Sequence, residues 1–255
     1  KEGHRGSSLK SMCCELHLLI ANIYDGIEDF EPAIFHLRQL IALKAEMGVD
    51  DYQLSTPLNL LGLMYYKASE YTSALSAFIK CATIRTKSNA SKTEITAVLY
   101  NIATVYKSIG ESDKALEIYI ELLENERELL QSENGVVPHP PKDFIVTLRQ
   151  IFQIYDHQGK TEEGLKYLLE AVDTCEMFKD HIEDSLGLGV FHLAGDTLSL
   201  LNQSSEAFSF YCKGCELFGN VDDNVVSSFG ERGIHLLLAQ ACNDQSVFPK
   251  HAAAA

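Results

Sequence analysis

The chain has 255 residues, of which 46% are apolar, and a formal net charge of −15 from 21 basic and 36 acidic side chains. No apolar run approaches the ~18 residues that a membrane-spanning helix needs. The acidic balance argues against a nucleic-acid backbone or an anionic membrane as the general partner. It is compatible with a basic or apolar peptide, or simply with solubility.

The cysteines and the chain ends indicate a cytoplasmic protein. The seven cysteines form no paired framework for a chain of this length, and the start of the chain lacks the apolar stretch of a secretory signal. Both features favour a reducing compartment. Residues 1–8 and 252–255 read as a tag or unassigned tails.

Apolar residues recur at helical spacing along most of the chain and predict consecutive helix pairs. The pairs are expected at about residues 9–47, 54–88, 92–132, 143–179 and 184–218, followed by a single helix over about 224–243. Thr56 is expected to cap its helix, with Pro57 as the first helical residue. Residues 134–142 contain three prolines, and the middle of this segment cannot be helical. An exposed linker is favoured there over a dedicated binding loop.

The stretch from Leu99 to Leu122 shows the unit that these pairs repeat. Ala103 is followed by Tyr106 after three residues, Gly110 after seven, Ala115 after twelve and Tyr119 after sixteen. The two alanines allow two helices to approach closely, and glycine tolerates the positive φ that ends the first of them. The stretch therefore predicts two short helices joined by a tight turn.

The unit recurs along the chain. Gly62 lies 41 residues before Ala103, and Ala21 lies another 41 residues before Gly62. Downstream, the equivalent positions are Phe152, after a step of 49 residues, and Gly195, after a step of 43 in a more degenerate copy. An internal repeat with a constant inner spacing is stronger evidence than any single motif.

This spacing of small and aromatic residues resembles the tetratricopeptide repeat, although the usual period of that repeat is about 34 residues. The long period, with stretches such as LSTPLNLLGLMYY, is similar to the repeats of the kinesin light chain family over roughly residues 10 to 218. The resemblance implies one all-α domain over residues 9–243. It implies a right-handed superhelical solenoid of about five helix hairpins with a C-terminal capping helix.

No pattern in the sequence indicates catalysis or a metal. Cys212 and Cys215 match C-x-x-C, but they lack the second ligand pair of a structural zinc site and the βαβ context of a redox pair. They are better explained as small buried residues of a helix. No glycine-rich phosphate loop, HExxH or Ser/His/Asp order is present. We therefore expect neither an enzyme nor a cofactor.

The resemblance places the first helix of each hairpin on the concave side of the superhelix. Residues three before, one after and four after the small residue then point into a groove, with Asn101 beside them. The candidate peptide-binding residues are Asn22, Asn59, Leu63, Tyr66, Tyr100, Asn101, Thr104, Lys107, Arg149, Gln153 and His192. Amide side chains can bond the backbone of an extended peptide, while aromatic rings accommodate its side chains.

Two functions remain open at this point. The main hypothesis is a non-catalytic adaptor that binds a peptide segment of a partner protein in the groove. The alternative is an architectural subunit of a larger cytoskeletal or transport-related assembly, which docks through its convex face and edges. Neither involves nucleic acid or insertion into a membrane.

Overall fold

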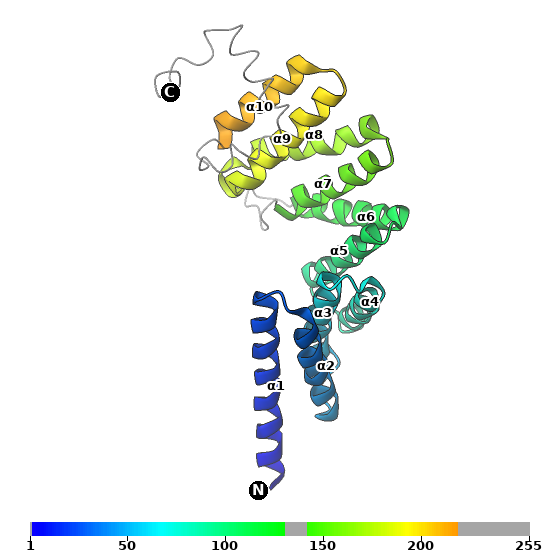
Figure 1. Ribbon diagram of the computed structural model, residues 1–255, viewed down its shortest axis with the longest axis vertical. Helices are drawn as coiled ribbons and strands as arrows, with labels where there is room; N and C mark the ends of the chain where they lie inside the picture. Colours follow the sequence, from blue (N-terminus) through cyan, green and yellow to red (C-terminus); the bar gives the residue numbers. More distant parts are fainter. Residues whose placement is uncertain (1, 131–141, 219–255) are drawn as a thin grey trace. The chain divides into compact units, whose positions relative to one another are not determined.

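The computed structural model describes residues 2–130 and 142–218, which form ten α-helices and one short 3-10 helix without any strand (Figure 1). The helices are α1 (Glu2–Gly26), α2 (Phe30–Glu46), α3 (Tyr52–Lys67), α4 (Tyr71–Lys87), α5 (Lys92–Ser108), α6 (Ser112–Leu130), α7 (Lys142–His157), α8 (Thr161–Met177), α9 (Asp184–Leu200) and α10 (Ser204–Phe218). The 3-10 helix is η1 (Lys179–His181). The all-α class and the five helix pairs are confirmed. The expected helix over 224–243 lies outside the described residues.

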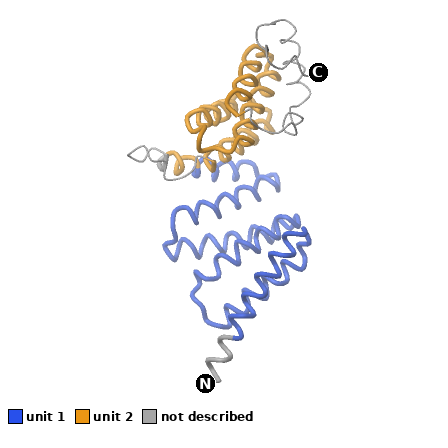
Figure 2. Tube along the Cα trace, turned by 90° about the vertical axis from the view of Figure 1, so that its left-hand side faces the viewer, with its two compact units in different colours: residues 1–122 blue, residues 123–255 orange. Residues whose placement is uncertain are grey.

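The helices divide into two compact units, Lys1–Leu122 and Leu123–Ala255, with the boundary inside α6 (Figure 2). In unit 1, α1 packs on α2 and α3 on α4, and each second helix also packs on the first helix of the next pair. Unit 2 repeats this order from α7 to α10. None of the described helices is long and apolar enough to span a bilayer. A single domain over residues 9–243 stays a prediction.

The turns inside the five hairpins share one backbone conformation. A residue with positive φ, between 58° and 84°, lies seven residues after the small position in every copy. These residues are Glu28, Ser69, Gly110, Gly159 and Asn202. The N–H of the following residue donates to a carbonyl five residues earlier, at 2.8–3.0 Å, which closes the first helix in the manner of a Schellman cap. The repeat register is therefore present in the backbone even where the turn residue is not glycine.

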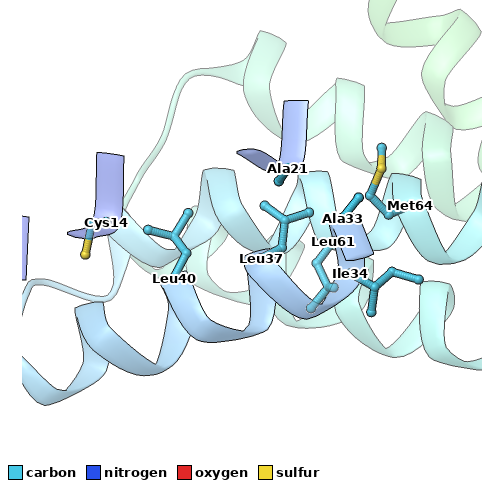
Figure 3. Close-up of a cluster of buried hydrophobic side chains, with 8 residues drawn as sticks. All are labelled: Cys14, Ala21, Ala33, Ile34, Leu37, Leu40, Leu61 and Met64. Atoms are coloured by element: carbon cyan, nitrogen blue, oxygen red, sulfur yellow. The ribbon is translucent and has the colours of Figure 1, made fainter. Parts of the chain in front are cut away.

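The buried apolar residues of unit 1 form two clusters between neighbouring helices. Figure 3 shows one cluster, in which Ala21 of α1 and Leu37 of α2 lie near Leu61 and Met64 of α3. A second cluster joins α3 and α4 to α5 and contains Phe78 and Val98. Because each core lies between consecutive helices, stability is approximately a sum of hairpin and neighbour terms.

In the second, third and fifth repeats a small residue allows close helix packing. A Cβ atom on Gly62 would lie 2.6 Å from the ring of Phe78, and one on Gly195 would lie 2.5 Å from the ring of Tyr211. Ala103 occupies the equivalent position in α5 and has no exposed surface. The aromatic residue sixteen positions later thus fills the space that the small residue leaves.

We expect Ala103→Leu to lower the free energy of unfolding by about 1–3 kcal/mol, because the larger side chain must displace the packed helices. The matched control is Ala97→Leu, on an exposed position of the same helix, which should change stability by less than about 0.5 kcal/mol. Urea denaturation followed by circular dichroism measures both changes. Equal effects of the two variants would show that Ala103 does not lie at the helix contact.

Two helix starts differ from expectation. α1 begins at Glu2 rather than near residue 9, and α3 begins at Tyr52, so that Pro57 lies inside the helix and Thr56 does not cap it. Pro57 has no N–H to donate to the carbonyl of Gln53. The Lys44 ammonium donates to that carbonyl instead, at 3.3 Å. This bond from α2 helps α3 to extend through the proline.

Candidate functional site

The first helices of the second and third repeats meet along a line of polar side chains in unit 1. The hydroxyl of Tyr52 donates to Glu94 at 2.6 Å, Asn101 Nδ2 donates to Asn59 Oδ1 at 3.1 Å, and the hydroxyls of Tyr66 and Ser108 lie 3.1 Å apart. We call these six residues the α3–α5 seam. The three pairs are seven residues apart on each helix, so they recur every two turns along one face.

Glu94 ties the seam to the start of α5. Its backbone N–H donates to the Ser91 side chain and its carboxylate accepts from the Ser91 N–H, which together form a capping box. Its carbonyl also accepts a bond from the buried Arg85 at 2.7 Å. The hydrogen bonds from Tyr52 and Ser91 lower the pKa of the Glu94 carboxyl. Sequence reasoning missed this residue, although the S-x-x-E pattern from Ser91 to Glu94 could have identified the cap.

The two asparagines at the centre of the seam are half-buried. Their mutual hydrogen bond uses one Asn101 amide hydrogen and one Asn59 oxygen lone pair. The chemistry of the two amides leaves further donors on Asn59 and an acceptor on Asn101. The pair can therefore bond both the C=O and the N–H groups of an extended backbone.

The remaining predicted residues of α3 and α5 differ in their surroundings. Thr104 bonds the hydroxyl of the buried Tyr119 of α6 at 2.9 Å, and the ring of Tyr100 stands edge-on to that of Tyr119, with centroids 5.5 Å apart. Leu63 packs against both apolar clusters of unit 1, and Lys107 is half-buried. Tyr100 and Thr104 thus both contact the second helix of their own hairpin.

The predicted residue on α1 stands apart from the seam. Asn22 is exposed. Asp25 of α1 forms an ion pair with Lys67 of α3. The structure therefore brings Asn59, Tyr66 and Asn101 together along the seam and leaves Asn22 exposed on α1.

The three predicted residues of unit 2 are Arg149, Gln153 and His192, and all are half-buried. The guanidinium of Arg149 is close enough to Cys175 of α8 to oppose the rise in that thiol's pKa, which burial brings to about 12. The ring of His192 packs edge-on to Tyr211 of α10, and burial lowers its pKa. Arg149 and His192 thus lie against the second helices of their own hairpins.

A cavity adjoins the seam at Tyr52, and the described residues hold neither a metal cluster nor a disulfide. A cavity of about 420 Å³ between α1, α2 and α3 is lined mainly by apolar side chains such as Leu18, Leu40 and Leu60. Among residues 2–130 and 142–218, no three His, Cys, Asp or Glu side chains are grouped as a metal site would require. The six cysteines of the same residues are unpaired thiols.

Comparison with known families identifies the repeat. Models of the tetratricopeptide repeat match residues 15–47 and residues 53–128. No curated protein matches the sequence.

Solved structures resemble the fold over most of the chain. A protein of Podosopora anserina with nearly identical TPR-like repeats, assigned as a kinesin light chain, is 17% identical with a TM-score of 0.62, over 83% of this chain and 94% of that one. BtubC (BKLC) of P. vanneervenii is 14% identical with a TM-score of 0.65, over 84% of this chain and 90% of that one.

A plasmid regulator gives a similar match. The Rap conjugation gene regulator of plasmid pLS20, solved in complex with the Phr* peptide, is 15% identical with a TM-score of 0.62, over 96% of this chain and 67% of that one. At these identities the likeness concerns the fold alone. The residues that the family models match are therefore tetratricopeptide repeats, and over most of the chain the helix hairpins share the fold of these kinesin light chain-like structures.

Proposed function

We propose that the chain is a non-catalytic adaptor of the cytoplasm that binds an extended peptide segment of a partner protein along the α3–α5 seam. The observation that carries the proposal is the Asn59–Asn101 amide pair on adjacent first helices, with Tyr66 seven residues after Asn59 on the same helix. Amides satisfy a peptide backbone, and tyrosine rings offer large contact area at little cost in rotamer entropy. The Rap regulator, a fold relative solved with a peptide, supports this kind of ligand.

Two observations favour this face over others. The polar pairs of the seam hold α3 and α5 at a constant spacing, so that the face exists before a ligand binds. Preorganised sites spend less binding free energy on ordering their side chains. The second helices carry no comparable run of paired amides and tyrosines in the described part of unit 1.

A peptide selected from a random display library against the folded chain tests the proposal. Tyr66→Ala together with Asn101→Ala should weaken its binding by about 2 kcal/mol or more, close to 30-fold, as expected for central anchors. Lys80→Ala with Glu117→Ala, on exposed positions of α4 and α6, should leave the affinity within about twofold. Isothermal titration calorimetry measures both.

Because Tyr66 and Asn101 also join α3 to α5, a second pair of variants separates binding from folding. Tyr66→Phe and Asn101→Asp keep the side-chain volumes and remove one hydroxyl and one amide donor. They also remove the seam bonds to Ser108 and Asn59, so calorimetry is done well below the melting temperature of each variant, where a weaker affinity reports binding and not folding. If the α4 and α6 variants abolish binding and the seam variants do not, the peptide binds elsewhere and an architectural role through outer surfaces is favoured.

A further inference from the structure

The outer face of α1 carries an uncovered apolar stripe. Six large apolar side chains of α1 and the turn that follows are more than half exposed, and they are Leu9, Met12, Leu16, Leu19, Ile23 and Ile27. From Leu9 to Ile23 their spacing alternates between three and four residues, which is the pattern of a helix that packs lengthwise against another helix. Contiguous apolar patches of this kind are uncommon on monomers and mark interaction sites.

The equivalent positions in the other repeats indicate what kind of element packs on this face. Leu16 and Ile23 lie five residues before and two residues after the small position of their repeat. The equivalent residues in later first helices are Pro57 and Met64, Val98 and Val105, Thr147 and Ile154, and Val190 and Thr197, and all are buried. In α5, Val98 and Val105 belong to the cluster that contains Phe78 of α4. The α1 stripe is therefore a stacking face that has no covering helix in the described part of the chain.

We propose that this stripe pairs with the same stripe of a second copy of the chain, with the two α1 helices antiparallel. In this arrangement Leu16 lies opposite Leu19 of the second copy, Met12 opposite Ile23, and Leu9 opposite Ile27. The stripe is self-complementary in this direction, as a two-fold symmetric interface requires. Every exposed apolar residue of the stripe then finds an apolar partner.

The charges of α1 favour a second copy over a charged partner. Lys10 pairs with Glu46 of α2, Asp25 pairs with Lys67 of α3, and Glu15 lines the cavity between these helices. The stripe itself carries no charge, and in the antiparallel pairing Glu15 comes near the neutral Asn22 of the other copy. Two acidic chains can thus meet at this face without direct repulsion.

The area of the stripe is sufficient for a reversible dimer. Burying six half-exposed aliphatic side chains removes roughly 600 Å² from water on each copy, and about 1,200 Å² in total, the lower limit of specific interfaces. A dimer of this size dissociates on dilution rather than persisting at all concentrations. The α1–α1 contact is independent of the peptide-binding proposal, because it uses neither α3 nor α5.

Sedimentation equilibrium tests the proposal on the full chain. The wild type should approach the mass of two chains at about 100 µM and that of one chain on dilution. Leu16→Glu with Leu19→Glu should remain a monomer throughout. An equimolar mixture of this variant with a chain that carries Leu16→Lys and Leu19→Lys should restore the dimer. In each of the two Leu16–Leu19 contacts a glutamate then faces a lysine.

The control places the same charge on apolar residues outside the stripe. Phe35→Glu with Ile79→Glu, on exposed positions of α2 and α4, should dimerise like the wild type. A monomeric wild type, a dimer that survives the double glutamate substitution, or a mixture that fails to pair would each overturn the proposal. A chain that stays monomeric and binds a synthetic peptide with the sequence of α4 would also overturn it. The stripe would then be covered by the second helix of a repeat and not by α1 of a second copy.

Discussion

Replacement of Phe78 by alanine should lower the free energy of unfolding by about 3–5 kcal/mol, as for other large aromatic side chains removed from a core. Phe78 is 1% exposed, and its ring fills the space beside Gly62, where a Cβ atom would lie 2.6 Å away. It also belongs to the cluster that joins α4 to Val98 and Ile102 of α5. The substitution therefore weakens both the α3–α4 hairpin and its contact with the next repeat.

Ile79→Ala is the matched control for this effect. Ile79 is the next residue of α4 and is 45% exposed, so its loss should cost less than about 1 kcal/mol. Urea denaturation of both variants, followed by circular dichroism, gives the difference. If Phe78→Ala costs no more than Ile79→Ala, the aromatic residue sixteen positions after the small residue does not carry the repeat core.

Glu126→Gln should make the protein more stable at pH 8 by about 3 kcal/mol and leave its stability at pH 4 nearly unchanged. Glu126 of α6 is 9% exposed. The Thr147 hydroxyl donates to Oε1 at 3.4 Å, and Oε2 has no hydrogen-bond partner among the described residues. Burial raises the pKa of the carboxyl to about 7, and the nearby charge of Asp143 adds to the rise.

The direction of this pH effect depends on how many protons the Glu126 carboxyl binds in the folded and in the unfolded state. The unfolded chain loses this proton near pH ~4.5, whereas the folded chain keeps it until about pH 7. Between these values the folded state binds more protons, so stability falls as the pH rises, and the loss is complete above pH 7. Glutamine cannot ionise and keeps an oxygen that accepts from Thr147.

Denaturation of the wild type and the variant at several pH values measures this difference. Glu124→Gln, at an exposed position two residues earlier, is the control and should follow the wild type. If the free energy of unfolding changes with pH in the same way for the wild type and Glu126→Gln, the carboxyl is ionised in the folded chain at neutral pH.

The helix hairpins could be predicted from the sequence because their signals are local. The spacing of Ala103, Gly110 and Tyr119 reports a close helix contact, a turn and a core residue within one repeat. In the fourth repeat, close packing depends on the combined volume of the two facing side chains and not on a particular residue at one position. Phe152 is large, and Gly164 twelve residues later is the member of the pair that stays small, since a Cβ there would lie 2.8 Å from Tyr155.

The candidate site could be predicted only in part. Asn59, Tyr66 and Asn101 could be placed on first helices, but their pairing depends on the rotation of α3 against α5, which no local pattern encodes. Ser108 and Glu94 were missed for this reason. The start of α3 depends in the same way on Lys44, which reaches the Gln53 carbonyl from another helix.

Photo-crosslinking tests most directly whether a peptide binds along the seam. A selected peptide that carries a photoreactive leucine at successive positions is irradiated in complex with the full chain, and the labelled segments are identified by mass spectrometry. We predict labels on Tyr52–Lys67 and Lys92–Ser108, the helices that form the α3–α5 seam. Labels confined to Tyr71–Lys87 or to α1, with these two helices unlabelled, would contradict the proposed peptide-binding face.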